Sequence, residues 1–229
     1  MRHIPGTFSI AAYDPETSTF GAAVTTGTVS VGATCPYVSS EAAAVTQSYT
    51  KTEHGREAVS RADAGERIDD AFESLLDADE HAAYRQVHGV GTDSSFAFTG
   101  DECVEWAGHR TGEHYTVAGN MLAGKAVVDA TAEAYESTTG DMAERLVSAL
   151  EAGEDAGGDD RGEMSAAILV HAPTPEMYHN LRVDLSETPV SDLRDLLTEA
   201  RRAKDRIRAE TDDLFGDYPE EILDFGVKY

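Results

Sequence analysis

The chain has 229 residues, 41% of them hydrophobic, so it is long enough for one domain of roughly 200 residues with a sizeable core. Its 43 acidic and 18 basic residues give a net charge of -25, which leaves no basic face for phosphates and excludes nucleic acid as an expected partner. The mean hydropathy of -0.38 and the lack of an apolar run of about 18 residues exclude a membrane span. Met1–Gly6 has no apolar signal region, so we expect a cytoplasmic location.

The acidic residues are spread along the whole chain, from Asp14 to Asp224. A net charge this large repels itself and destabilises the compact state unless salt screens it. We therefore expect a protein adapted to molar salt, with an acidic protein of ordinary conditions as the alternative. Its melting temperature should rise between about 0.1 and 2 M KCl, and an unchanged melting temperature over that range would contradict the adaptation.

The first elements of the chain have the composition of strands. Thr7–Tyr13 is rich in β-forming and small residues, the segment 14–17 supplies turn chemistry, and Phe20–Thr26 is predicted to return as a hairpin. Ala42–Gln47 is a candidate buried strand, although its alanine content leaves a helix open by propensity alone.

The central elements change period twice. Charged and apolar residues alternate at helical spacing over 55–76, which predicts two helices broken near 63–65. A two-residue period then predicts three strands, at 86–91, 95–99 and 115–119, with turns at 100–101 and 112–113.

The remaining elements complete an alternation of strands and helices. Amphipathic helices are predicted at 121–136 and 141–151, a loop at 153–162, strands at 166–170 and 180–184, a charged helix from 190 to roughly 208, and a short helix at 218–223. Two antiparallel β-layers between helices satisfy this order, so we predict an α+β fold.

Residues 7–24, 42–48, 98–124 and 157–170 follow one another in order across most of the predicted domain. These four segments resemble the family catalogued as domain of unknown function 1028, which is grouped with the N-terminal-nucleophile (Ntn) hydrolases. The resemblance implies a four-layer αββα sandwich. We expect this Ntn-hydrolase-like domain at 7–185, preceded by an extension or propeptide at 1–6 and followed by an acidic helical tail at 186–229.

The resemblance implies that Thr7 is the catalytic nucleophile. In Ntn hydrolases the nucleophile is the first residue of the mature chain, and its α-amine, with a pKa of about 7.7–8.0, serves as the base. Here residues 1–6 precede Thr7, so its nitrogen is an amide. Cleavage at Gly6–Thr7, or a different start site, would restore the mechanism, and glycine permits the backbone strain of such a cleavage. Otherwise Thr7 is a β-branched residue that begins a strand.

Two more residues of the matching segments are catalytic candidates. Asn120 follows a predicted strand and precedes a predicted helix, where it could be an oxyanion donor or a helix N-cap. His109 lies between two predicted strands and could orient a substrate or shuttle a proton. A structural hydrogen bond is the alternative for His109.

Four residues are candidates for substrate binding. Gln47 and Ser48 end a buried strand and could face the cleft, or make ordinary strand-end hydrogen bonds. Arg161 and Ser165 flank the entry to the strand at 166–170. Arg161 could clamp a carboxylate with two hydrogen bonds, or pair with a neighbouring aspartate as scaffolding.

Other chemistries lack their motifs. The chain has no HxxxH or CxxC pair and no GxGxxG or GxxxxGK[ST] motif, so we expect neither a metal nor a cofactor. Cys35 and Cys103 are expected to be reduced thiols. The predicted function is hydrolysis of a small amide or peptide-like substrate, and the alternative is a non-catalytic binding or assembly protein. Either could form a homo-oligomer through the tail helix.

Overall fold

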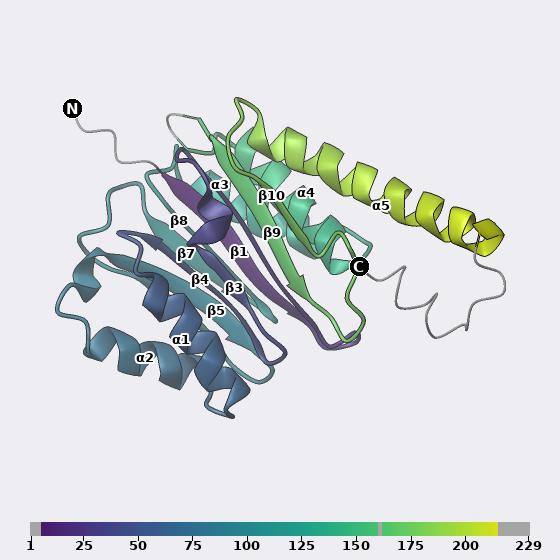
Figure 1. The fold of residues 1–229 in the computed structure, drawn as a ribbon. Coiled ribbons are helices and arrows are strands. Elements are labelled where there is room, and N and C mark those ends of the chain that lie inside the picture. Colours follow the sequence, from purple (N-terminus) through teal and green to yellow (C-terminus); the bar gives the residue numbers. More distant parts are fainter. Residues whose placement is uncertain (1–5, 160–161, 215–229) are drawn as a thin grey trace.

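The computed structural model describes residues 6–159 and 162–214, with side chains described through residue 206. Two antiparallel sheets lie face to face (Figure 1). The larger sheet has the order β10-β9-β2-β1-β8-β7 and consists of β1 (Thr7–Asp14), β2 (Thr19–Thr26), β7 (Gly108–Gly112), β8 (Tyr115–Asn120), β9 (Ser165–His171) and β10 (Asn180–Val183). The smaller has the order β3-β4-β5-β6 and consists of β3 (Pro36–Val38), β4 (Ala42–Ser48), β5 (Arg85–Gly91) and β6 (Ser95–Thr99).

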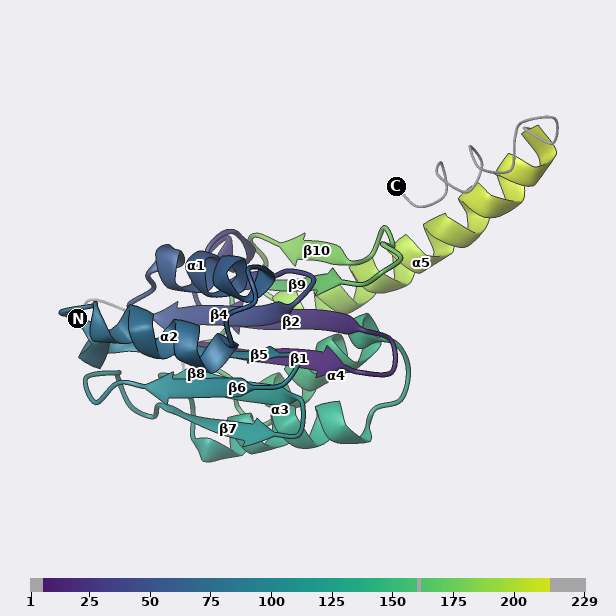
Figure 2. The ribbon, with the colours of Figure 1, turned by 90° about the horizontal axis from the view of Figure 1, so that it is seen from below.

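Helices cover the outer surface of each sheet. The smaller sheet carries α1 (Thr52–Asp63) and α2 (Ile68–Asp77), and the larger carries α3 (Lys125–Ser137), α4 (Met142–Asp155) and α5 (Pro189–Leu214) (Figures 1 and 2). The layer order is therefore αββα, and the predicted α+β sandwich with a C-terminal helix is confirmed.

The two-residue period of β1 sends its side chains alternately to two different cores. Phe8 and Ile10 join the core beneath α3 and α4, whereas Ala11 joins the apolar cluster between the sheets. Ser9 lies on that inter-sheet side as well, because it hydrogen-bonds to residues of β4 and β5. Thr7 shares this face by the same alternation, so the start of β1 points into the space between the sheets.

The space between the sheets has an apolar end and a polar end. The apolar end is formed by small and branched side chains: Ala11, Phe20, Ala22, Val24, Val31, Cys35, Ala43, Val45, Val90 and Ala167. The polar end begins one residue pair further along the same strands, with Ser9 on β1, Gln47 on β4 and His88 on β5, all fully buried. Buried polar groups require hydrogen-bond partners, so the side chains at this end form an organised polar cluster and a candidate functional site.

The tail helix is anchored to the domain by its first half. Val190, Leu193 and Leu197 are fully buried in the core beneath the larger sheet. Arg194 adds bonds of 2.9 and 2.8 Å to the carboxylate of Glu151 on α4. The later turns of α5 project past the body of the domain (Figure 2).

The elements differ from the sequence-based prediction at β3, at β7 and at the start of α3, and the alternative left open for 42–48 is decided. The 42–48 segment is a strand and not the alternative helix, because both of its faces are buried. The strands β3 and β7 were not predicted, and β7 contains His109, which had been expected between strands. The helix expected from residue 121 begins at Lys125. The short helix predicted at 218–223 lies outside the described residues.

The described ranges contain neither a membrane-spanning helix nor a metal-binding cluster. None of the described helices is long and apolar enough to cross a membrane. Among the described side chains, no group of three or more His, Cys, Asp or Glu residues could hold a metal ion.

Candidate functional site

Strand pairing brings three of the predicted site residues to one end of the larger sheet. Thr7 at the start of β1 pairs with Asn120, the last residue of β8, and with Thr26, the last residue of β2. Thr26 in turn pairs with Ser165, the first residue of β9. All four side chains are buried. Residues far apart in the sequence therefore meet around the proposed nucleophile.

The smaller sheet reaches the same end through two glutamines. Gln47 of β4 pairs with Gln86 of β5, and their side chains are joined by a bond of 2.7 Å from Gln47 Nε2 to Gln86 Oε1. Asn120 Nδ2 donates to the same Gln86 oxygen over 3.0 Å, and Gln86 Nε2 donates to the Gly119 carbonyl over 2.8 Å. Gln86 thus links the two sheets beside Thr7.

The carbonyl of Gly6, on the residue before Thr7, lies in a pair of donors. Thr26 Oγ1 donates to it over 2.6 Å, and the Gly27 N–H donates to it over 3.2 Å. We refer to these two donors as the carbonyl cradle. Two converging donors on one carbonyl oxygen are the arrangement that stabilises an oxyanion if that carbon is attacked.

The hydroxyls of Thr7 and Thr26 are 2.9 Å apart. Because Thr26 gives its proton to the Gly6 carbonyl, Thr7 donates and Thr26 accepts in this contact. The Thr7 hydroxyl proton therefore points to Thr26 Oγ1, whose own proton is given to the Gly6 carbonyl oxygen. A cross-strand pair of threonines also stabilises the sheet by a few tenths of a kcal/mol to about 1 kcal/mol.

Asn120 is fixed as a strand residue with its amide turned into the site. It ends β8, four residues before the Gly124 that precedes α3, so the N-cap alternative is wrong. Its bond to Gln86 uses one of the two protons of Nδ2.

A second buried chain of contacts lies behind the glutamines. Ser9 Oγ donates to Gln47 Oε1 over 2.6 Å and lies 2.7 Å from His88 Nε2. His88 Nδ1 lies 2.9 Å from Thr116 Oγ1. All four side chains are fully buried. Burial of the ring lowers the pKa of His88 to about 3, so the imidazole is neutral at physiological pH.

The depressed pKa of His88 makes stability depend on pH. The unfolded chain protonates this ring near its ordinary pKa of about 6.5, whereas the folded protein does so only near 3. The stabilisation is therefore fully present above the unfolded pKa and is lost as the pH falls toward 3. We expect His88→Gln to lose less stability than the parent between about pH 7 and 4, measured by urea unfolding in high salt. Equal losses in the two proteins would contradict this role.

His109 lies at the outer end of the same network. It is an exposed residue of β7, and its Nδ1 lies 2.9 Å from Thr99 Oγ1. Thr99 in turn accepts a bond of 2.9 Å from Gln86 Nε2. Partial burial lowers the pKa of His109. The structure therefore connects His109 to Asn120 through two intermediaries.

The remaining predicted residues have different surroundings. Ser165 Oγ donates to the Thr28 carbonyl over 2.7 Å and accepts from the Val31 N–H over 3.1 Å, so its hydroxyl holds the loop after β2. Ser48 ends β4 and is partly exposed, with a positive φ of 65°. Arg161 lies outside the described residues.

Five described non-glycine residues have left-handed backbone conformations, and three of them lie near this end of the sandwich. Ser30, Ser48 and Met121 have φ values of 59°, 65° and 51°. Each such residue costs on the order of 1–3 kcal/mol and persists only where its surroundings hold it. The other two, Ser18 and His114, lie in the β1–β2 and β7–β8 turns at the opposite end, so these conformations alone do not mark the Thr7 cluster.

The thiols are poor competitors of Thr7 for the role of nucleophile. Cys35 and Cys103 are both buried free cysteines. Burial raises the pKa of Cys35 to about 11 and raises that of Cys103 above its ordinary value. Since the thiolate is the reactive form, neither is activated at neutral pH.

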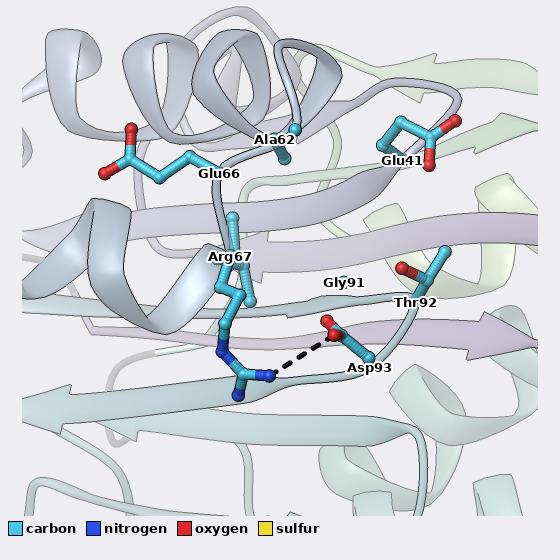
Figure 3. A pocket seen from close by; sticks show the side chains of 9 residues that line it. Glu41, Ala62, Glu66, Arg67, Gly91, Thr92 and Asp93 are labelled. Atoms are coloured by element: carbon cyan, nitrogen blue, oxygen red, sulfur yellow. Dashed lines mark hydrogen bonds and ion pairs between the residues drawn. The ribbon is translucent and has the colours of Figure 1, made fainter.

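A surface pocket lies at the opposite end of the smaller sheet (Figure 3). It is lined by Glu41, Ala62, Gly65, Glu66, Arg67, Ile68, Gly91, Thr92 and Asp93. The guanidinium of Arg67 pairs with Asp69 over 2.8 Å and with Asp93 over 3.3 Å. Gly91 and Gln86 stand at opposite ends of β5, about 17 Å apart at 3.3–3.4 Å per residue. The pocket is therefore separate from the Thr7 cluster.

Four residues of the Thr7 end were missed by the sequence analysis: Ser9, Thr26, Gln86 and His88. One sequence pattern could have found the polar strand residues. They alternate with apolar neighbours in strands whose two faces are both buried. In a strand that is buried on both faces, a polar side chain has no access to solvent and must hydrogen-bond to other protein groups.

Comparisons with known proteins give a family match and similar solved structures. A family model described as "Family of unknown function (DUF1028)" matches residues 7–193. The crystal structure of a protein from Silicibacter pomeroyi assigned to the same family model has 32% identity and a TM-score of 0.79, covering 85% of this chain and 86% of that one. Eukaryotic HslV from Trypanosoma brucei is similar over 72% of this chain and 99% of its own, at 9% identity and a TM-score of 0.46. No curated protein matches the chain.

Proposed function

Because the chain belongs to DUF1028, a family of unknown function, its activity must follow from the chemistry of its site, and we propose that it is an amide hydrolase with Thr7 as nucleophile. The proposal rests on the Thr26 hydroxyl, which contacts both the Thr7 hydroxyl and the Gly6 carbonyl. These are the reacting groups of a cleavage at Gly6–Thr7.

The first reaction is self-processing. Thr7 Oγ1 attacks the Gly6 carbonyl carbon while the carbonyl cradle stabilises the developing oxyanion. The Gly6–Thr7 C–N bond breaks as the Thr7 nitrogen takes up the hydroxyl proton, which converts the amide into an ester. Water hydrolyses this ester, releasing residues 1–6 as a carboxylate and leaving a free α-amine on Thr7.

The second reaction is hydrolysis of an external amide. The α-amine, with an ordinary pKa near 8, takes the Thr7 hydroxyl proton as Oγ1 attacks the substrate carbonyl. The amine then protonates the leaving nitrogen, and water hydrolyses the acyl-threonine. Asn120 Nδ2, held by Gln86, donates to the oxyanion. The substrate is a small amide or peptide-like compound.

The other predicted residues take supporting parts in this proposal. His109 and Ser48 would contact and orient the substrate from the rim. Arg161, by its chemistry alone, would bind a substrate carboxylate with two hydrogen bonds. Gln47 is fully buried and bonded to Gln86, so it acts by positioning Gln86 and not by touching substrate. Ser165 supports the loop after β2 in the same indirect way.

The mature N-terminus tests the proposal. Intact mass and N-terminal sequencing of protein purified in high salt should give a chain that begins at Thr7. Thr26→Val removes the donor to Gly6, and we expect it to slow processing by about 10²–10³-fold, the usual effect of losing one oxyanion donor. Thr25→Val is the matched control, because the neighbouring hydroxyl donates to the Ser165 carbonyl outside the cradle.

A chain that keeps residues 1–6 would instead favour a non-catalytic binding or assembly protein. The observation behind this second candidate is the peptide bond between Gly6 and Thr7, which leaves Thr7 without an amine. A homo-oligomer formed through α5 is compatible with both candidates, and so is a cytoplasmic location.

A further inference from the structure

Gly6 occupies a space that admits no side chain. A Cβ built on Gly6 would lie 2.7 Å from the Met121 carbonyl oxygen and 2.8 Å from Asp159 Cγ. Real Cβ contacts essentially never fall below 3.0 Å, so a substituent on this α-carbon requires its surroundings to move. The α-carbon next to the cradled carbonyl is therefore enclosed from two sides.

The Met121 side of this enclosure is backbone and is held in place. The Met121 N–H donates to the Val104 carbonyl and the Leu122 N–H donates to the Trp106 carbonyl, each over 3.1 Å. Leu122 also bridges to Asp159, which ties the two sides of the enclosure together. A backbone oxygen anchored in this way cannot rotate aside as the end of a flexible side chain would.

Gly27, the second donor of the cradle, meets the same restriction. Its N–H donates to Asp159 Oδ2 over 3.1 Å as well as to the Gly6 carbonyl. A Cβ on Gly27 would lie 2.6 Å from Asp159 Oδ2 and 3.0 Å from the Gly162 carbonyl oxygen. A side chain on either glycine would therefore meet atoms closer than ordinary contact, so the space around the cradle is small.

We propose that this enclosure is the acyl subsite of the mature enzyme, and that it selects substrates whose acyl group is unbranched at the α-carbon. The inference rests on the proposed function, because the subsite becomes vacant only when residues 1–6 leave. The substrate class is then amides of acetyl-like and glycyl-like acids.

The selectivity follows from where the acyl group must bind. An external substrate is attacked by the same Thr7 hydroxyl, and its carbonyl oxygen can take over the two donors that the Gly6 carbonyl releases. Its α-carbon then faces Met121 and Asp159, as the α-carbon of Gly6 does. A hydrogen fits at that position, and a methyl branch does not.

The test compares p-nitrophenyl esters of acetic, propionic and isobutyric acid, whose leaving group is constant and whose α-carbon carries zero, one or two methyl groups. The Thr7→Ala variant supplies the blank for spontaneous hydrolysis. We expect kcat/KM to fall by about 10–100-fold from acetyl to isobutyryl, since forcing a methyl into a filled space costs about 1–3 kcal/mol. Equal rates, or faster turnover of the isobutyryl ester, would overturn the subsite.

Labelling with methanesulfonyl fluoride distinguishes failure of the subsite from failure of the proposed hydrolase. The reagent has no α-branched acyl group, and its attachment to an active Thr7 is seen as a gain in intact mass. A labelled protein with no branching preference overturns the subsite and leaves the hydrolase standing. An unlabelled protein that turns over none of the esters overturns both.

Two aspartate variants test whether Asp159 forms one side of the enclosure. Asp159→Ala removes one side, so the isobutyryl ester should gain relative to the acetyl ester. Asp155→Ala, at an exposed position on α4, should keep the parent ratio. A parent ratio in Asp159→Ala would overturn the assignment of Asp159 to the enclosure.

Discussion

Thr7→Ala is expected to leave a folded chain that keeps residues 1–6 and hydrolyses no amide above background. The substitution removes the oxygen that attacks in both proposed reactions. Losses for a missing nucleophile run to about 10⁶-fold in kcat, so we expect at least about a 10³-fold loss in any measurable turnover. Intact mass reports the processing step, and release of a chromogenic amine reports the second.

Stability is the control for this variant. Thr7 is buried and its hydroxyl makes one contact, to Thr26, so the loss should be about 1–2 kcal/mol in the free energy of unfolding. Thr7→Ser keeps a hydroxyl at the same position and should process and turn over more slowly than the parent but measurably. A Thr7→Ala variant that is processed and active would remove Thr7 from the mechanism.

Gln86→Met should cause the largest loss of stability among substitutions in the polar network. Gln86 Oε1 accepts from Gln47 Nε2 and from Asn120 Nδ2, so methionine leaves two buried donors without their partner. Each unsatisfied buried group costs about 1–3 kcal/mol, which predicts a total loss of roughly 2–6 kcal/mol. Urea unfolding in high salt measures it.

Thr99→Val is the comparison for Gln86→Met. It removes the outer bond from Gln86 Nε2, whose remaining acceptors include the Gly119 carbonyl, together with the contact to the exposed His109 ring, so we expect a loss of about 1 kcal/mol. If Gln86→Met were no less stable than Thr99→Val, Gln86 would not be the centre of the network. Where Gln86→Met still folds, kcat should fall more than KM rises, because Asn120 loses the partner that orients it.

The sequence predicted the strands that carry strong apolar patterns. β1, β2 and β9 were predicted to within a few residues because their small and branched side chains are buried on both faces. The strand β7, with the sequence Gly-His-Arg-Thr-Gly, has no apolar alternation because it is a half-exposed edge strand. The segment forms a strand because it hydrogen-bonds to β8, and its own composition does not predict this.

Site residues could be predicted from the sequence only where the residue type and its segment matched the family. Thr7 and Asn120 were reached through the family resemblance, and strand register brings them together. Thr26 has the composition of any β-branched strand residue, and only the hairpin register of β1 and β2 sets it opposite Thr7. Gln86 is separated from Asn120 by more than thirty residues and lies in the other sheet, so no local pattern could link them.

The position of Thr7 has a consequence for the enzyme after the proposed cleavage. A newly made chain end normally frays, because its first residues have few neighbours to hold them. Thr7 belongs to a strand with hydrogen-bonded neighbours on both sides, β2 and β8, near the middle of a six-stranded sheet. The new α-amine would therefore be held in place by the sheet. No further folding step would be needed between cleavage and its use as a base.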